Sequence, residues 1–137
     1  MQSCNDVRGS VKSIPSLQEL TVWQRSIELS IQVYTLTRSF PKDELFGLTH
    51  QLRRASVPIS SNIAEGQSRL TKPDFIHFLS IARGSNAEVR SQLALARGLG
   101  FGDDILIGRC EGMSTEVSKM LNALISSLRS PKPQQPD

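Results

Sequence analysis

The stretch QLRRASVPISSNIAEGQSR, residues 51–69, contains the features that decide the fold of this chain. Its apolar residues recur every three or four positions, which predicts an α-helix with one buried face. Pro58 removes one backbone N–H near the middle of this helix and is expected to kink it between Arg54 and Pro58. Gly66 is expected to end the helix. Together with the residues just before it, the buried face comprises Leu45, Leu48, Leu52, Ala55, Ile59 and Ile63.

The same spacing of apolar residues recurs in three further segments, and no segment alternates with the period of a β-strand. Thr71, with Asp74 three residues later, suits the start of a helix, and Gly98 suits its end; Asp103 or Asp104 suits the start of the next helix. The predicted buried stripe of the helix after Thr71 comprises Phe75, Leu79, Ala82, Asn86, Val89, Leu93 and Ala96. Short connections between the segments favour antiparallel neighbours. The sequence therefore predicts an all-α protein, an antiparallel up-down-up-down four-helix bundle. The helices are expected at residues 18–39, 42–65, 72–97 and 103–128.

A chain of 137 residues is long enough for one domain with a real core. We expect the bundle to occupy residues 17–129. Residues 1–16 and the proline-rich residues 130–137 lack periodicity and are predicted to be flexible tails. The sequence has no apolar run long enough for a membrane span and no apolar stretch typical of a signal peptide, so a cytoplasmic location and no membrane partner are expected.

The first predicted helix carries large apolar residues on two sides, and one bundle core can cover only one of them. A stripe assigned to the core holds Leu20, Trp23, Ile27, Ile31 and Tyr34. The other stripe lies roughly 150–210° around the helix, and leaving it in water would forgo roughly 1.5–3 kcal/mol per large side chain. It is predicted to contact another copy of the chain, with a folded-back tail or a different protein as the alternatives. This predicted interface comprises Val22, Leu29, Val33, Leu36 and Phe40.

The polar residues of the opening stretch have a predicted structural role. A short connection after the second helix sets Ala55 and Ser56 opposite residues 82–85. There the small residues Gly84 and Ser85 would let the two helices approach closely. Arg54 is then expected to form an interhelical ion pair with Glu88, and the carboxylate four residues before Arg69 is expected to pair with that arginine. The predicted structural polar network comprises Arg54, Asn62, Glu65 and Glu88.

No set of residues in the chain has the pattern of a catalytic or metal site. His50 and His77 lie on different predicted helices, and neither has a partner in an HExxH-type motif. Ser60 and Ser61 lack the strand-turn-helix setting of a nucleophile elbow. We therefore predict no enzymatic activity, no cofactor, no metal and no small-molecule substrate. The two cysteines are interpreted as a thiol in the tail and a small buried side chain, Cys4 and Cys110 respectively.

Arginines that recur every seven residues form a ridge along the third predicted helix: Arg83, Arg90 and Arg97. Arg53 and Arg54 of the neighbouring helix are candidates to extend it. Such a ridge suits the phosphates of RNA or DNA, since guanidinium groups bind phosphate oxygens well. Its lack of aromatic side chains argues against reading of specific bases. The alternative is a solvated face whose arginines pair with the fourth helix, through Glu111 and Glu116.

Four segments share motifs with one known family: LTVWQRSIELSIQVYTLTRSFP (20–41), QLRRASVPISSNIAEG (51–66), FLSIARGSNAEVRSQLALARGLGF (78–101) and MLNALISSL (120–128). With these segments the chain resembles the four-helix-bundle proteins encoded in intervening sequences of 23S rRNA genes, whose relatives include accessory proteins of diversity-generating retroelements. The resemblance implies a ring-like homo-oligomer, most often a pentamer. The retroelement relatives resemble nucleic-acid-binding partners of a reverse transcriptase. Many relatives have proline at the position of Ser60, whereas this chain has Pro58.

Two functions from different classes agree with these observations. The preferred one is a non-enzymatic, homo-oligomeric helical scaffold with weak, sequence-independent binding of RNA or DNA through the arginine ridge. A ring would multiply weak contacts several-fold, which favours this function. The alternative is a purely structural or protein-interaction module that binds no nucleic acid.

Overall fold

The computed structural model describes residues 16–130, and every element in this range is helical. Cys4 and all but one residue of each predicted tail lie outside the described range. Two short 3-10 turns, Leu17–Glu19 and Lys42–Glu44, precede the first and second long helices. The all-α class is confirmed. The long helices are α2 (Thr21–Thr37), α3 (Leu48–Gln67), α4 (Lys72–Leu99) and α5 (Asp104–Arg129).

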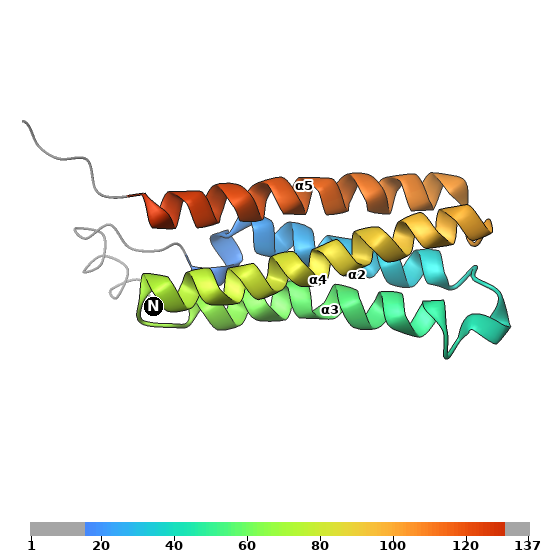
Figure 1. Ribbon diagram of the computed structural model, residues 1–137, viewed down its shortest axis with the longest axis horizontal. Coiled ribbons are helices and arrows are strands. Elements are labelled where there is room, and N and C mark those ends of the chain that lie inside the picture. The colour runs from blue at the N-terminus through green and yellow to red at the C-terminus, as the bar shows by residue number, and fades with distance from the viewer. Residues whose placement is uncertain (1–15, 131–137) are drawn as a thin grey trace, which may run out of the picture.

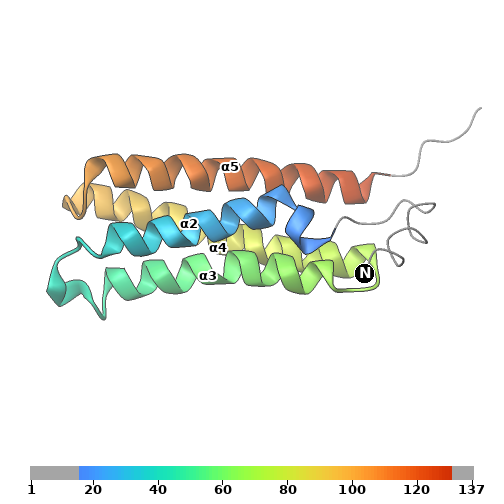
Figure 2. The same cartoon turned by 180° about the vertical axis from the view of Figure 1, so that it is seen from behind.

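The four long helices lie side by side along one axis (Figure 1). Each helix packs on its neighbours in the sequence, and α2 also packs on α5, so the helices surround one core. The opposite view in Figure 2 shows the same arrangement from behind. Helices α2 and α3 run in opposite directions. Arg53 of α3 donates a hydrogen bond to Thr37 at the end of α2, whereas the backbone oxygen of Ser56 accepts one from Ser30, seven residues before Thr37.

The starts of α4 and α5 follow the capping residues expected from the sequence. The hydroxyl of Thr71 accepts a hydrogen bond from the backbone N–H of Asp74 at 3.2 Å, and Asp103 caps the first turn of α5 with one carboxylate oxygen. The end of α4 differs from the prediction, because the helix continues past Gly98 to Leu99. Gly100 ends it with a φ of 73°, a left-handed conformation that glycine adopts without strain.

The start of α3 lies later than predicted. The acidic segment expected to form its first turn is the 3-10 turn Lys42–Glu44, and α3 begins at Leu48. The carboxylate of Glu44 accepts a hydrogen bond from the N–H of Leu48 at 3.0 Å, so it caps the helix from outside. Leu45, predicted in the core, is therefore exposed in the turn between the two elements.

Gly66 does not end α3 as predicted but lets α3 and α4 approach each other. The helix continues to Gln67, and a Cβ atom on Gly66 would lie 2.9 Å from atoms of Phe75 and of Phe78. Gly84, which was expected to provide a close approach, is exposed with no heavy atom within 4 Å of a Cβ placed there. The tightest contact of these helices thus lies beside their turn and not at Gly84.

The buried face of α4 is the one predicted from its spacing. All seven residues of the predicted stripe are buried, including one polar residue, Asn86. Asn86 donates to the backbone oxygen of Ser114 in α5 at 2.9 Å and accepts from the Ser114 hydroxyl at 2.8 Å. Because each side chain satisfies the other, this polar pair can lie in the core at little cost. The buried stripe comprises Phe75, Leu79, Ala82, Asn86, Val89, Leu93 and Ala96.

The two stripes of α2 are largely exchanged relative to the prediction: in the stripe assigned to the core, Leu20 is buried and Trp23 packs against the core, but Ile31 and Tyr34 are exposed. The five residues assigned to an interface between copies are buried in the core of the single chain, so that assignment is wrong. Ser26 and Thr37 lie on the same buried side, where their hydroxyls bond backbone oxygens of the same helix. The corrected residues are Val22, Leu29, Val33, Leu36 and Phe40.

Candidate interaction surfaces

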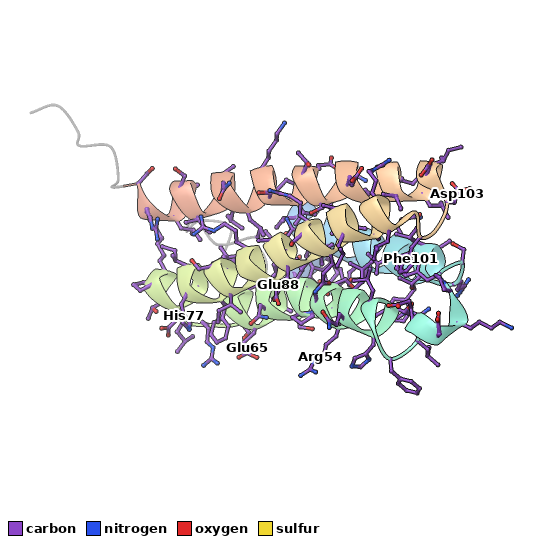
Figure 3. All side chains as sticks on the ribbon, turned by 45° about the vertical axis from the view of Figure 1, so that its right-hand side comes forward. Arg54, Glu65, His77, Glu88, Phe101 and Asp103 are labelled. Atoms are coloured by element: carbon purple, nitrogen blue, oxygen red, sulfur yellow. The ribbon has the colours of Figure 1, made fainter. Side chains whose placement is uncertain are left out.

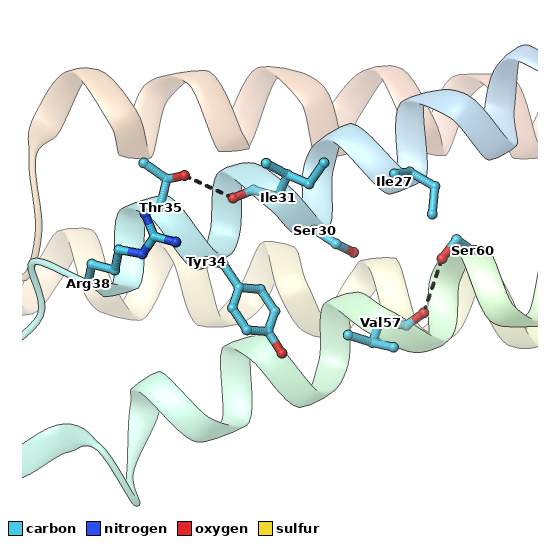
Figure 4. A pocket seen from close by; sticks show the side chains of 8 residues that line it. All are labelled: Ile27, Ser30, Ile31, Tyr34, Thr35, Arg38, Val57 and Ser60. Atoms are coloured by element: carbon cyan, nitrogen blue, oxygen red, sulfur yellow. Dashed lines mark hydrogen bonds between the residues drawn. The ribbon is translucent and has the colours of Figure 1, made fainter.

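An apolar surface extends over α2 and α3 on the outside of the bundle. Its most exposed large side chains are Ile31, Val57 and Tyr34, with exposed fractions of 57%, 44% and 40%. They surround a hollow of about 450 Å³ (Figure 4). We call this surface the α2/α3 face, and its lining residues are Ile27, Ser30, Ile31, Tyr34, Thr35, Arg38, Val57 and Ser60.

The edge of the α2/α3 face is held in place by polar contacts between the two helices. The hydroxyl of Ser30 donates to the backbone oxygen of Ser56 at 3.1 Å. The Nε of Arg53 donates to the hydroxyl of Thr37 at 2.8 Å, and its guanidinium lies 4.7 Å from the centre of the Tyr34 ring. Arg53, a predicted nucleic-acid residue, is thus engaged between α2 and α3 and does not join the ridge on α4.

A second, more polar hollow of about 370 Å³ lies between α3 and α4. Arg54 and Glu88 both line it, on the side of the bundle seen in Figure 3. The predicted ion pair between them is absent from the described part of the chain, although the two residues share the hollow. The side-chain oxygen of Gln92 is shielded from solvent there and has no hydrogen-bond donor. The polar groups of this hollow are therefore not satisfied by each other.

The rest of the predicted polar network stabilises the end of α3. The side-chain amide of Asn62 donates to the backbone oxygen of Pro58 at 2.8 Å. Glu65 forms an ion pair with Arg69 at 2.7 Å, as predicted, and the Arg69 guanidinium lies 4.8 Å from the centre of the Phe78 ring. These residues act locally, and they do not connect to Arg54 or Glu88.

The arginine ridge of α4 faces α5, and two of its three members have partners. Arg97 binds both carboxylate oxygens of Glu111, at 2.8 and 3.1 Å, and these hydrogen bonds raise the pKa of Arg97 above its usual value. Arg83 donates to the side-chain oxygen of Asn122 at 3.0 Å. Among the described residues Arg90 makes no hydrogen bond or ion pair. The five predicted nucleic-acid residues therefore lie in three different grooves and form no single ridge.

One ion-pair cluster was not predicted from the sequence. Arg25 of α2 binds Glu28 at 2.7 Å and lies 3.4 Å from Glu116 of α5. Glu116 had been expected to pair with the ridge on α4. The three-residue spacing of Arg25 and Glu28 is a helical signal for the first contact. The contact of Arg25 with Glu116 depends on which side of α2 faces α5, and the prediction from the sequence assigned that side incorrectly.

The described residues offer few groups for chemistry. No group of three or more histidine, cysteine or acidic side chains among residues 16–130 is placed to hold a metal ion. Cys110 is fully buried in α5, and this burial raises the pKa of its thiol to about 11. The Cys110 thiol is therefore protonated at neutral pH and lacks the thiolate of a reactive cysteine. Within the same residues no helix is long and apolar enough to cross a membrane.

The fold and surfaces define an all-helical protein with exposed apolar and basic surfaces. Its family follows from the sequence: residues 18–123 match the family described as 23S rRNA-intervening sequence protein. The chain belongs to this family, which confirms the resemblance drawn from its motifs.

A solved structure with the same fold comes from the S23 ribosomal protein family of Bacteroides thetaiotaomicron and is described as a protein of unknown function. The two chains align with a TM-score of 0.71 and 24% sequence identity, over 77% of this chain and 96% of the other. This similarity supports the fold alone. No curated protein matches the chain.

Proposed function

We propose that the protein is a non-catalytic, homo-oligomeric helical scaffold whose copies associate through the α2/α3 face. The observation that carries this proposal is the exposure of Ile31, Tyr34 and Val57 around one apolar hollow. Clustered exposed apolar side chains are typical of protein interaction sites, whereas single ones are ordinary. Complete burial of a large apolar side chain contributes roughly 1.5–3 kcal/mol, so covering three half-exposed ones supplies a few kcal/mol.

The family resemblance favours a ring, with five copies as the expected number. A ring requires two different surfaces on each copy, because a self-complementary contact closes at a dimer. The α2/α3 face supplies one of them. Light scattering on the purified full chain is expected to give a mass near five times that of the 15.1 kDa chain.

The α2/α3 face is tested by charging its most exposed isoleucine. Ile31→Asp is expected to dissociate the assembly into single chains without unfolding them, since this side chain lies outside the core. Ile105→Asp is the matched control, because Ile105 is exposed at the start of α5, away from this face. Both variants are compared with the wild type by light scattering and circular dichroism. A monomeric wild type, or an Ile31→Asp variant of unchanged mass, contradicts the proposal.

Nucleic-acid binding is the second candidate function, favoured by the exposed Arg90 that has no partner in the described chain. Arg83 and Arg97 flank it at seven-residue intervals, so phosphates could compete for guanidinium groups held by Asn122 and Glu111. The expected binding is weak, independent of sequence and steeply reduced by salt. Binding is measured by the fluorescence anisotropy of labelled random-sequence RNA as protein is added, and the titration is repeated at rising salt concentration. Arg90→Gln is expected to reduce affinity most, and an equal effect of Lys119→Gln would contradict a role for the ridge.

A further inference from the structure

We infer that the second surface of the association is the outer side of α4, and that Arg38 of one copy pairs with Glu88 of the next. This inference rests on the proposed association through the α2/α3 face and specifies what that face binds. The outer residues of α4 recur with spacings of four and three and lie within roughly 80° of one another. We call them the α4 stripe: Ile81, Ser85, Glu88, Gln92, Leu95 and Leu99.

The α4 stripe has an apolar residue on each side of a polar centre. Ile81 and Leu95 are exposed by 40% and 53%. Between them, Gly84 leaves the surface flat, because no heavy atom lies within 4 Å of where its Cβ would be. A neighbouring helix can approach closely at such a position. These features suit the packing of a helix from another copy.

The α4 stripe and the α2/α3 face carry unpaired charges of opposite sign. Glu88 at the centre of the α4 stripe forms no ion pair within the described chain, and the shielded oxygen of Gln92 lacks a donor. Arg38 lies at the rim of the α2/α3 face and likewise forms no ion pair or hydrogen bond with a described residue. A buried charge is costly unless it is paired, so covering either surface requires a partner of opposite sign. Arg38 and Glu88 each supply the partner that the other lacks, and Arg54, which shares the hollow with Glu88, forms no ion pair with it within the described chain.

The spacing of the residues allows both contacts at once. Ile31 precedes Arg38 by seven residues, and Arg38 keeps helical backbone angles at the end of α2. Seven residues span about 10.5 Å along a helix. In α4, Ile81 lies seven residues before Glu88 and Leu95 lies seven residues after it. When Arg38 pairs with Glu88, Ile31 therefore faces an apolar side chain whichever way the two helices run.

The two surfaces lie on neighbouring sides of the bundle. Val57 lines the α2/α3 face, whereas the next residue, Pro58, lines the hollow between α3 and α4. Neighbouring sides of a four-helix bundle meet at close to a right angle. A contact between them turns each copy by the same angle relative to the one before, which closes a ring after few copies. A self-complementary contact of the α2/α3 face would instead leave the α4 stripe uncovered.

Charge reversal tests the pairing. Arg38→Glu and Glu88→Arg are each expected to raise the protein concentration needed for assembly at least about tenfold. The double variant is expected to recover assembly, because it again offers opposite charges at every contact. Lys119→Glu on α5 is the control for net charge and should match the wild type. Masses are measured by light scattering over a dilution series, with circular dichroism to show that each variant is folded.

The outcomes separate this inference from the proposed function. If the wild type assembles and both single charge reversals assemble equally well, the pairing is overturned. The α2/α3 face then remains as an association site. A double variant that stays dissociated overturns the pairing as well. A monomeric wild type overturns both proposals. If a charge reversal unfolds the chain, Arg38→Gln and Glu88→Gln replace it, and unchanged assembly of both would again overturn the pairing.

Discussion

Helices α2 and α4 divide their side chains between core and surface in different ways. In α4 one continuous stripe is buried, and the outer side combines three apolar residues with Glu88 and Gln92. In α2 both sides are apolar, and the buried one includes Ser26 and Thr37. The exposed side carries the larger aromatic residue, Tyr34. Large apolar side chains such as Ile31 and Tyr34 can therefore lie on the side of a helix that faces away from the core.

The buried hydroxyls of α2 explain how this is possible. Ser26 donates to the backbone oxygen of Val22 at 2.7 Å, and Thr37 donates to that of Val33 at 2.8 Å. Because each hydroxyl is satisfied within its own helix, it can be buried at little cost. Small side chains at these positions also leave room for neighbouring helices. Shape and hydrogen bonding thus decided which side of α2 packs inward.

The largest expected effect distinguishes the two sides of α2. Leu29→Ala should lower the free energy of unfolding by roughly 2–5 kcal/mol, because Leu29 is fully buried and its loss leaves a cavity. Ile31→Ala should lower the free energy of unfolding of the single chain by less than about 1 kcal/mol, since the side chain is mostly exposed. Urea denaturation at a concentration where the chain is dissociated measures both. Equal losses would contradict the orientation of α2.

A second comparison concerns two glycines on the helices that pack most closely. Gly66→Ala is expected to destabilise the protein by about 1–3 kcal/mol, because the added Cβ would lie 2.9 Å from atoms of Phe75 and Phe78. Gly84→Ala should stabilise the single chain by about 0.5–1 kcal/mol, because alanine is the better helix former and its Cβ meets no atom. Thermal denaturation midpoints should therefore shift in opposite directions. A stabilising Gly66→Ala would refute the close contact beside the turn.

A smaller effect is expected at the helix starts, which also differ between α2 and α4. The start of α4 is capped by the Thr71 side chain, whereas α2 begins after Leu20 without a side-chain cap. Thr71→Ala should cost about 1 kcal/mol, and Thr71→Ser should retain most of the stability. Urea titrations of the two variants measure the difference. If alanine and serine behave alike, the cap contributes nothing.

A last effect is a pH dependence that comes from the core beside α2 and α4. Burial raises the pKa of Cys110 from 9.0 to about 11, so the folded chain keeps the thiol protonated where the unfolded chain ionises it. This contribution to stability is complete below about pH 9 and is lost as the pH rises through about 11. The measurement compares the Cys4→Ser protein with the same protein carrying Cys110→Ala, by urea titration. The difference between their free energies of unfolding should narrow between pH 8 and pH 10.5, because only the protein with Cys110 loses stability as the thiol of its unfolded state ionises. A constant difference would show that Cys110 is not sealed in the core.

Much of the fold could be predicted from the sequence because its local signals agree. In α4 the apolar spacing, Thr71 and the C-terminal glycines all indicate the same helix, and the predicted stripe is the buried one. The start of α3 was misplaced because Asp43 and Glu44 suit a first turn in either type of helix. Two apolar sides on α2 gave no local signal to choose between them, since the choice depends on how three other helices pack.

The candidate sites were less predictable than the fold. Spacing along one helix identified the ridge of Arg83, Arg90 and Arg97, but the partners of these arginines lie on α5 and depend on how the helices are rotated. Arg54 and Glu88 were correctly expected on the same side of the bundle. Their failure to form an ion pair depends on side-chain distances that sequence spacing does not define.

The exposed side of α2 as a contact between copies is tested most directly by the reactivity of a cysteine placed there. In a Cys4→Ser background, Ile31→Cys and Leu29→Cys are labelled with a thiol reagent at increasing protein concentration. We predict that the cysteine at position 31 reacts rapidly in dilute solution and becomes protected as copies associate, whereas the one at position 29 is protected throughout. A position 31 cysteine that reacts equally at concentrations where light scattering shows association would contradict this account.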